Sequence, residues 1–138
     1  MSGREQKKLK QETRACIAYI VGRLIFGSEA SSIYDYSQSK QISFSGHVTS
    51  AGVDVTMEFP ESSDGWRVTS ENSSNRGNSL YLYLYNHPTM KHIELFVHNN
   101  GHFSGYDLDP QRSFEGFANG NNIFLKDFDF PDQYTYSI

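Results

Sequence analysis

Bulky and polar residues alternate along most of the chain from Ile33 onward, and this period of two predicts β-strands. The alternating runs are rich in Val, Ile, Tyr and Phe, and clusters of Gly, Pro, Asn, Asp and Ser separate them. Ten strands are predicted, near residues 32–37, 41–49, 52–59, 66–71, 79–86, 91–98, 102–109, 113–118, 122–129 and 133–138. Because the links are short, we expect an antiparallel meander, with one long, flexible polar loop from Ser70 to Ser79.

A different pattern, without alternation, fills the first 30 residues and predicts a helix from about Arg4 to Phe26, with Gly27 as its stop. The first half of this segment is charged, whereas the second half is apolar on nearly every side, most clearly from Ala15 to Val21. An apolar surface of this kind must be covered, either by the strands or by a neighbouring subunit. We therefore interpret residues 1–30 as a packing or oligomerisation element and residues 31–138 as a β-meander domain, which together form one structural domain.

Several predicted strands are apolar on both faces rather than on one. Between Leu80 and Tyr85, leucines share one face of the strand and tyrosines the other. A barrel closed by ten strands buries one face inside and leaves the helix or another subunit to cover part of the other. We therefore predict a mainly β fold, with one N-terminal α-helix followed by about ten antiparallel strands in a hairpin-repeat meander. A closed barrel is favoured, and a two-layer sandwich with the helix across one end is the alternative.

A degenerate repeat runs through the strands, in which an acidic residue between bulky neighbours leads into a turn. The middle residues of its five copies are Asp35, Glu58, Leu84, Asp107 and Asp127, which stand 23, 26, 23 and 20 residues apart. This spacing equals about two strands and two turns, so that the copies are expected at similar ends of successive hairpins. Leu84 lacks the acid and breaks the series.

Acids at equivalent strand ends, with tyrosines beside them, are the candidate binding residues. A barrel mouth lined with carboxylates, flat rings and hydroxyl groups suits sugars, amines or nucleoside-like ligands. The predicted ligand-binding residues are Tyr34, Asp35, Tyr36, Glu58, Tyr83, Tyr85, Tyr106, Asp107 and Asp127. Turn chemistry, and charges that keep exposed strands from aggregating, would account for the same acids without any ligand.

Histidines offer a weaker candidate site. His92 and His98 would lie on one strand, but they would stand roughly 20 Å apart along it, too far to ligate one ion. His98 and His102 can approach each other across a turn, without a third ligand. Cys16 lies in the apolar part of the helix, where burial makes a thiol unreactive. We therefore predict no metal site, no cofactor and no catalytic residue.

Charge is distributed unevenly along the chain, whose net charge is −4. Residues 1–30 hold six Lys or Arg against three acids, a net +3, which leaves −7 for the rest. An acidic body repels phosphate backbones, which argues against a nucleic-acid partner. The apolar run in the helix is shorter than the roughly 20 residues that a membrane span needs.

Length and cysteine content bound the class of protein further. A chain of 138 residues suits one domain with its own core. Cys16 is the single cysteine, which excludes an internal disulfide and favours a reducing compartment, the cytoplasm. Secretion stays open as an alternative, because a basic start and an apolar centre resemble a signal peptide, although Arg23 interrupts the apolar region.

From these patterns we expect a non-enzymatic binding or interaction protein that self-associates and presents a Tyr- and Asp-lined surface to a small ligand or a protein partner. A small barrel enzyme that uses carboxylate and histidine acid–base chemistry is one alternative, and a purely structural assembly protein is another. Catalysis would require at least two titratable groups that meet in a concave site, whereas an interaction protein can keep its acids exposed and apart.

Overall fold

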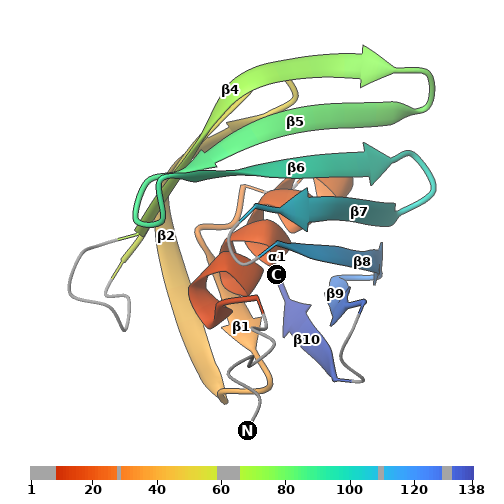
Figure 1. Ribbon diagram of the computed structural model, residues 1–138. Helices are drawn as coiled ribbons and strands as arrows, with labels where there is room; N and C mark the ends of the chain where they lie inside the picture. The colour runs from red at the N-terminus through yellow and green to blue at the C-terminus, as the bar shows by residue number, and fades with distance from the viewer. Residues whose placement is uncertain (1–8, 28, 59–65, 109–110, 129–131) are drawn as a thin grey trace, which may run out of the picture.

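Figure 1 shows the computed structural model, which describes residues 9–27, 29–58, 66–108, 111–128 and 132–138. Within these residues one helix precedes ten strands, and every strand pairs antiparallel with the next. The elements are α1 (Gln11–Phe26), β1 (Ser32–Asp35), β2 (Lys40–Thr49), β3 (Gly52–Met57), β4 (Trp66–Arg76), β5 (Ser79–Asn86), β6 (Lys91–His98), β7 (His102–Asp107), β8 (Arg112–Asn119), β9 (Asn122–Asp127) and β10 (Gln133–Ser137). Pairing of β1 with β10 closes the sheet into a barrel, which confirms the favoured fold.

Helix α1 lies inside the barrel (Figure 1). Every residue from Thr13 to Gly22 is buried, on all sides of the helix, and the helix packs against β9, β2 and β1. A small residue permits this approach, since a Cβ at Gly22 would stand 2.9 Å from Ile138 Cδ1 and 3.1 Å from Ile123 Cδ1. The chain thus covers its own apolar helix, and between Thr13 and Gly22 no apolar face is left for a second subunit.

The helix is shorter at its start than the sequence suggests. It begins at Gln11, because Lys10 has an extended backbone, with φ −66° and ψ 146°. Leu9 is buried before it, and the predicted start at Arg4 lies outside the described residues. The helix ends at Phe26 as predicted, with Gly27 in the left-handed region at φ 61°.

Strand β4 replaces most of the long loop that was predicted from Ser70 to Ser79. It continues to Arg76 and pairs with β5 over this stretch, with a register shift between Ser70 and Asn72. The turn that follows is Gly77–Asn78. Most side chains along this part of β4 are exposed and show no apolar alternation. The strand is therefore held by its backbone pairing with β5. The predicted strand ends at residues 59, 109 and 129 lie outside the described residues.

Two glycines make room for large rings in the core. A Cβ at Gly105 would stand 2.4 Å from Phe114 Cζ and 2.1 Å from the backbone oxygen of Glu94. A Cβ at Gly116 would stand 2.5 Å from Phe103 Cζ. Both phenylalanines are fully buried, so that each ring occupies the space that a side chain on the neighbouring strand would need.

We expect Gly105→Ala to lower the free energy of unfolding by about 2 kcal/mol or more, because the added methyl overlaps a backbone oxygen of the neighbouring strand. Gly52→Ala is the matched control, since the nearest atom to a Cβ there would be Ser70 Oγ at 3.6 Å. It should change the free energy by less than about 0.5 kcal/mol. Urea unfolding followed by circular dichroism measures both variants, and equal losses would show that Gly105 is not crowded.

Candidate functional site

Eight of the nine residues predicted to bind a ligand fall into two groups, one buried and one at the surface. Asp35, Asp107 and Asp127 are the last residues of β1, β7 and β9, and all three are buried. The tyrosines are half-buried or exposed, and they are Tyr34, Tyr36, Tyr83, Tyr85 and Tyr106. The aspartates and the tyrosines therefore do not share one surface.

The strand ends differ from the expected repeat in two of its copies. Strand β3 ends at Met57, so that Glu58 lies one position further on and is exposed. Strand β5 ends at Asn86, which is buried like the aspartates, whereas Leu84 packs in the core. The polar residue that ends β5 is therefore Asn86, two positions after Leu84.

Asp35 holds the turn between β1 and β2. Its Oδ1 accepts hydrogen bonds from the backbone N–H groups of Ser37 and Gln38, at 2.9 and 3.3 Å, and from the Ser37 hydroxyl at 2.7 Å. Its Oδ2 accepts a hydrogen bond from the Gln38 side-chain amide at 2.6 Å. Turn chemistry thus accounts for Asp35, with no ligand required.

Asp127 connects the strands to the chain just before the helix. Its Oδ2 accepts a hydrogen bond from the Leu9 backbone N–H at 3.3 Å, and its Oδ1 lies 3.6 Å from Arg112 Nε. The two side chains are only 2% and 11% exposed, so this ion pair is largely shielded from water. The Asp127 carboxylate also lies near the start of α1, where the helix dipole is positive. A negative charge at this position stabilises the helix.

Further polar groups surround the first turn of α1. Asn86 Nδ2 donates a hydrogen bond to Thr13 Oγ1 at 3.4 Å. Arg14 Nη1 donates one to the Leu9 carbonyl at 2.6 Å, and its guanidinium stacks 3.8 Å from the centre of the Tyr134 ring. Burial, followed by the nearby Asp35 charge, raises the pKa of Tyr136, which lies among these groups. We call these side chains, together with Asp127 and Arg112, the polar cluster. Their contacts fix the start of the helix inside the barrel.

The buried aspartates lie away from the main surface hollows of the described part of the chain. Asp35, Asp107 and Asp127 do not line any of the main hollows at the surface of the described residues. Acid–base catalysis needs its titratable groups in contact with substrate. Asp35 and Asp127 have instead the structural contacts described above.

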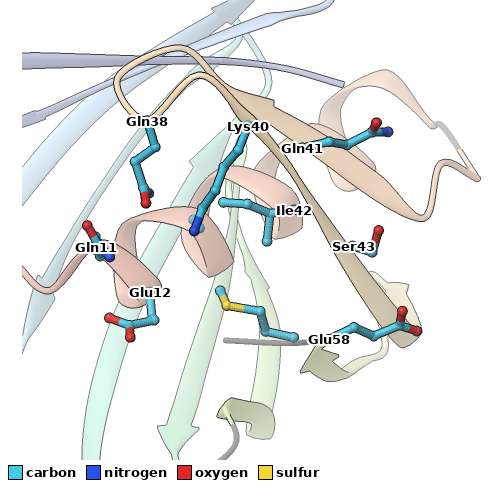
Figure 2. A pocket seen from close by; sticks show the side chains of 10 residues that line it. Gln11, Glu12, Gln38, Lys40, Gln41, Ile42, Ser43 and Glu58 are labelled. Atoms are coloured by element: carbon cyan, nitrogen blue, oxygen red, sulfur yellow. The ribbon is translucent and has the colours of Figure 1, made fainter. Parts of the chain in front are cut away.

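Glu58, the remaining predicted residue, borders the hollow in Figure 2. This hollow has a volume of about 140 Å³ and lies between the first turns of α1 and the strands β2 and β3. Lys40 points into it, whereas the carboxylates of Glu12 and Glu58 lie on opposite sides (Figure 2). Ala15, Ile42 and Met57 contribute apolar groups to its lining. Because ligand pockets usually exceed about 300 Å³, we assign no ligand to it.

Six rings form a continuous aromatic strip along β5, β6 and the turn between them. Its members are Phe96, Tyr81, Tyr83, His92, Tyr85 and His87. Tyr83 stacks on His92, with 4.3 Å between ring centres and 6° between planes. Tyr81 lies nearly parallel to Tyr83 at 6.4 Å and contacts Phe96 at 4.9 Å. The strip faces outward, because the leucines that alternate with these tyrosines point into the core.

A hollow of about 530 Å³ lies beside the aromatic strip, over β4, β5 and β6. Its lining consists of Asn72, Ser73, Ser74, Arg76, Tyr81, Tyr83 and Glu94. The Arg76 guanidinium stands 4.2 Å from the centre of the Tyr81 ring, and the Tyr81 hydroxyl donates a 2.9 Å hydrogen bond to Glu94 Oε2. Burial raises the pKa of Tyr81 to about 12, and this hydrogen bond adds to the shift. The hollow thus combines flat rings with hydrogen-bonding groups of both charges.

The two ends of the barrel differ in the side chains of their turns. The end at which α1 begins, which we call the apolar end, carries four large exposed side chains: Tyr36, Met90, Leu108 and Phe128, with exposed fractions of 54%, 72%, 39% and 52%. At the opposite end the turns consist of small or polar residues, at Ser50–Ala51, Gly77–Asn78, Asn99–Asn100 and Gly120–Asn121. Grouped exposed hydrophobic side chains are typical of interaction surfaces.

The histidines and the cysteine do not form a reactive centre within the described residues. His98 Nδ1 lies 2.5 Å from Ser79 Oγ, whereas the His102 ring packs on Phe117. No group of three or more His, Cys, Asp or Glu residues there could hold a metal ion. Burial, with the charge of Glu12, raises the pKa of the Cys16 thiol, which keeps it protonated and unreactive. None of the described helices is long and apolar enough to cross a membrane.

Sequence reasoning found part of the aromatic strip and missed its polar neighbours. Tyr83 and Tyr85 were predicted, whereas Arg76, His92 and Glu94 were not. A signal for the last two exists, because they alternate with aliphatic residues along their strand and so share the outward face. The register that places Glu94 opposite Tyr83 depends on the turn between β5 and β6, which alternation alone does not fix.

Comparison with protein-family models, with curated proteins and with solved structures gave no match.

We expect Asp127→Asn to lower the free energy of unfolding by about 3 kcal/mol, because it leaves the Arg112 charge without this buried partner. Asp54→Asn is the matched control. It removes the same charge from the exposed Asp54–Arg67 pair, and its effect should stay below about 1 kcal/mol. Thermal and urea unfolding measure both variants. Similar small losses would mean that the buried pair does not anchor the helix.

Proposed function

We propose that this protein is a non-enzymatic binding protein and that the aromatic strip, with the hollow beside it, is its ligand site. The observation that carries the proposal is the unbroken contact of six rings, two of which, Tyr81 and Tyr83, line a hollow of about 530 Å³. Ring stacking already fixes the orientation of these side chains, so that a ligand need not pay to order them. A hollow of this size lies within the range of small-ligand sites.

The chemistry of the hollow favours a sugar as the ligand. One face of a sugar ring presents C–H groups that pack on a flat aromatic ring, while its hydroxyls need both donors and acceptors. Tyr83 supplies the ring, Arg76 and Asn72 supply donors, and Glu94 supplies acceptors. Arg76 and Glu94 carry opposite charges at the same hollow, which favours an uncharged ligand over a phosphate-bearing one.

A binding role also agrees with the position of the acids. Asp35 holds a turn, Asp127 binds the backbone just before the helix, and the lining of the hollow contains one carboxylate, Glu94. A glycosidase would need a pair of carboxyl groups flanking the bond it cleaves. We therefore propose binding without turnover.

We expect Tyr83→Ala to weaken sugar binding by about tenfold, because one stacked ring contributes up to about 1.5 kcal/mol beyond its buried area. Heteronuclear NMR titration with a panel of neutral tetrasaccharides and free nucleosides measures the affinity. Tyr34→Ala is the matched control, since Tyr34 is an exposed tyrosine on β1, away from the strip, and its removal should leave the affinity unchanged. Equal effects of the two variants, or binding of nucleosides but no sugar, would contradict the proposal.

Self-association through the apolar end is a second candidate function. Met90 is held at φ 57°, a conformation that non-glycine residues rarely adopt, while its side chain is 72% exposed. Charges of both signs lie at the same end, with Lys91 at the start of β6 and Glu58 just after β3. A second copy in a two-fold arrangement could therefore pair these charges around the apolar side chains.

We expect the double variant Met90→Asp, Phe128→Asp to be monomeric at concentrations where the unaltered chain forms a dimer, because the charges cannot be buried in an apolar contact. Native mass spectrometry and sedimentation velocity measure the mass. Phe117→Asp is the control, since Phe117 is an exposed ring on the side of the barrel, and it should leave the dimer intact. A monomeric unaltered chain at high concentration would rule out this function.

A further inference from the structure

A separate hollow of about 430 Å³ opens at the end of the barrel opposite the apolar end. It lies where α1 stops, between the last turn of the helix and the hairpins β2–β3, β4–β5 and β6–β7. The residues that line it are Leu24, Ile25, Ser50, Asn75, Gly77, Asn78, Ser79, Leu80, Val97, His98, Asn99 and Gly101. We call this space the mouth hollow.

The mouth hollow exists because the helix does not fill the whole barrel. Helix α1 packs against β9, β2 and β1, while β4, β5 and β6 curve over it (Figure 1). The helix ends at Phe26, and the space beyond it is left to side chains. A barrel of ten strands is wide enough to leave such a space.

The inner part of the mouth hollow is aliphatic. Leu24 and Ile25 come from the helix, and Leu80 and Val97 come from the neighbouring strands β5 and β6, where they lie opposite each other. Leu24, Ile25 and Leu80 remain half-buried although they pack on the core. A ligand that covered them would gain the free energy of removing this aliphatic surface from water.

The rim of the mouth hollow is polar but uncharged. It offers amides and hydroxyls from residues such as Asn78 and Ser79, and none of the twelve lining residues is Asp, Glu, Lys or Arg. His98, the single titratable group there, is already fixed by its 2.5 Å contact with Ser79 Oγ. A charged ligand would lose water without gaining a countercharge, which is costly.

We propose that the mouth hollow binds an uncharged amphipathic small molecule. Its apolar body lies on Leu24, Ile25, Leu80 and Val97, and a hydroxyl or amide group meets the polar rim. The volume of about 430 Å³ lies within the range of small-ligand pockets. This site is independent of the aromatic strip, whose rings lie on the outer face of the same strands.

The full chain is titrated with two fluorescent probes of similar size. One is N-phenyl-1-naphthylamine, which is uncharged at neutral pH, and the other is the anionic 1-anilinonaphthalene-8-sulfonate. We expect saturable binding of the uncharged probe and binding of the anionic probe that is about tenfold weaker or more. NMR spectra should show shifts confined to the methyl groups of the four aliphatic residues and their neighbours. Equal affinities, no binding of the uncharged probe, or shifts elsewhere would overturn the proposal.

Leu80→Trp fills the hollow and should weaken binding of the uncharged probe by about tenfold. Leu108→Trp makes the same change at the apolar end and is the matched control, with no effect expected. Asn99→Trp places the bulk at an exposed turn on the rim, so it tests the site even if Leu80→Trp does not fold. Circular dichroism verifies each fold. Unchanged affinity in a folded Leu80→Trp or Asn99→Trp variant would overturn the proposal.

Discussion

The burial of α1 inside the barrel is the constraint on which the rest of the structure depends. Eight strands enclose a space that side chains can just fill, and ten strands enclose more. The helix supplies the missing volume, with every residue from Thr13 to Gly22 buried. Small residues such as Ala18 and Gly22 keep it narrow enough to fit. The burial of this much apolar surface is the largest favourable contribution to the free energy of folding. It explains how a helix that is apolar on all sides can be covered by the strands of its own chain.

A helix inside a barrel creates a polar problem at its start. The first backbone N–H groups of a helix lack partners within it, and its dipole places positive charge there. Lys10 provides no side-chain cap, and buried groups from the strand ends surround this region instead. Asp127 binds the backbone of Leu9, and Asn86 binds Thr13. These contacts give Asp127 and Asn86, two of the buried polar residues at the strand ends, a role in the fold.

Surfaces available for binding therefore lie outside the wall and at the two ends. The side chains of the aromatic strip occupy the outward positions of β5 and β6. The inward positions of the same two strands carry core residues. Gly105 on β7 and Gly116 on β8 leave space for the buried rings of Phe114 and Phe103. The two ends differ because their turns differ, apolar at the helix start and polar at the mouth hollow.

The sequence by itself determined the ten strands, the end of the helix at Phe26 and the opposite faces of the leucines and tyrosines in β5, because a period of two and a glycine stop are local signals. The tertiary structure decided where the helix lies. A helix sequence that is apolar on all sides must be covered, but the sequence does not specify whether strands or another subunit cover it. It also decided that Asp107 and Asp127 face inward, because side-chain direction at a strand end depends on register and closure. The pairing of Arg76, Tyr81 and Glu94 joins three strands, which no local pattern encodes.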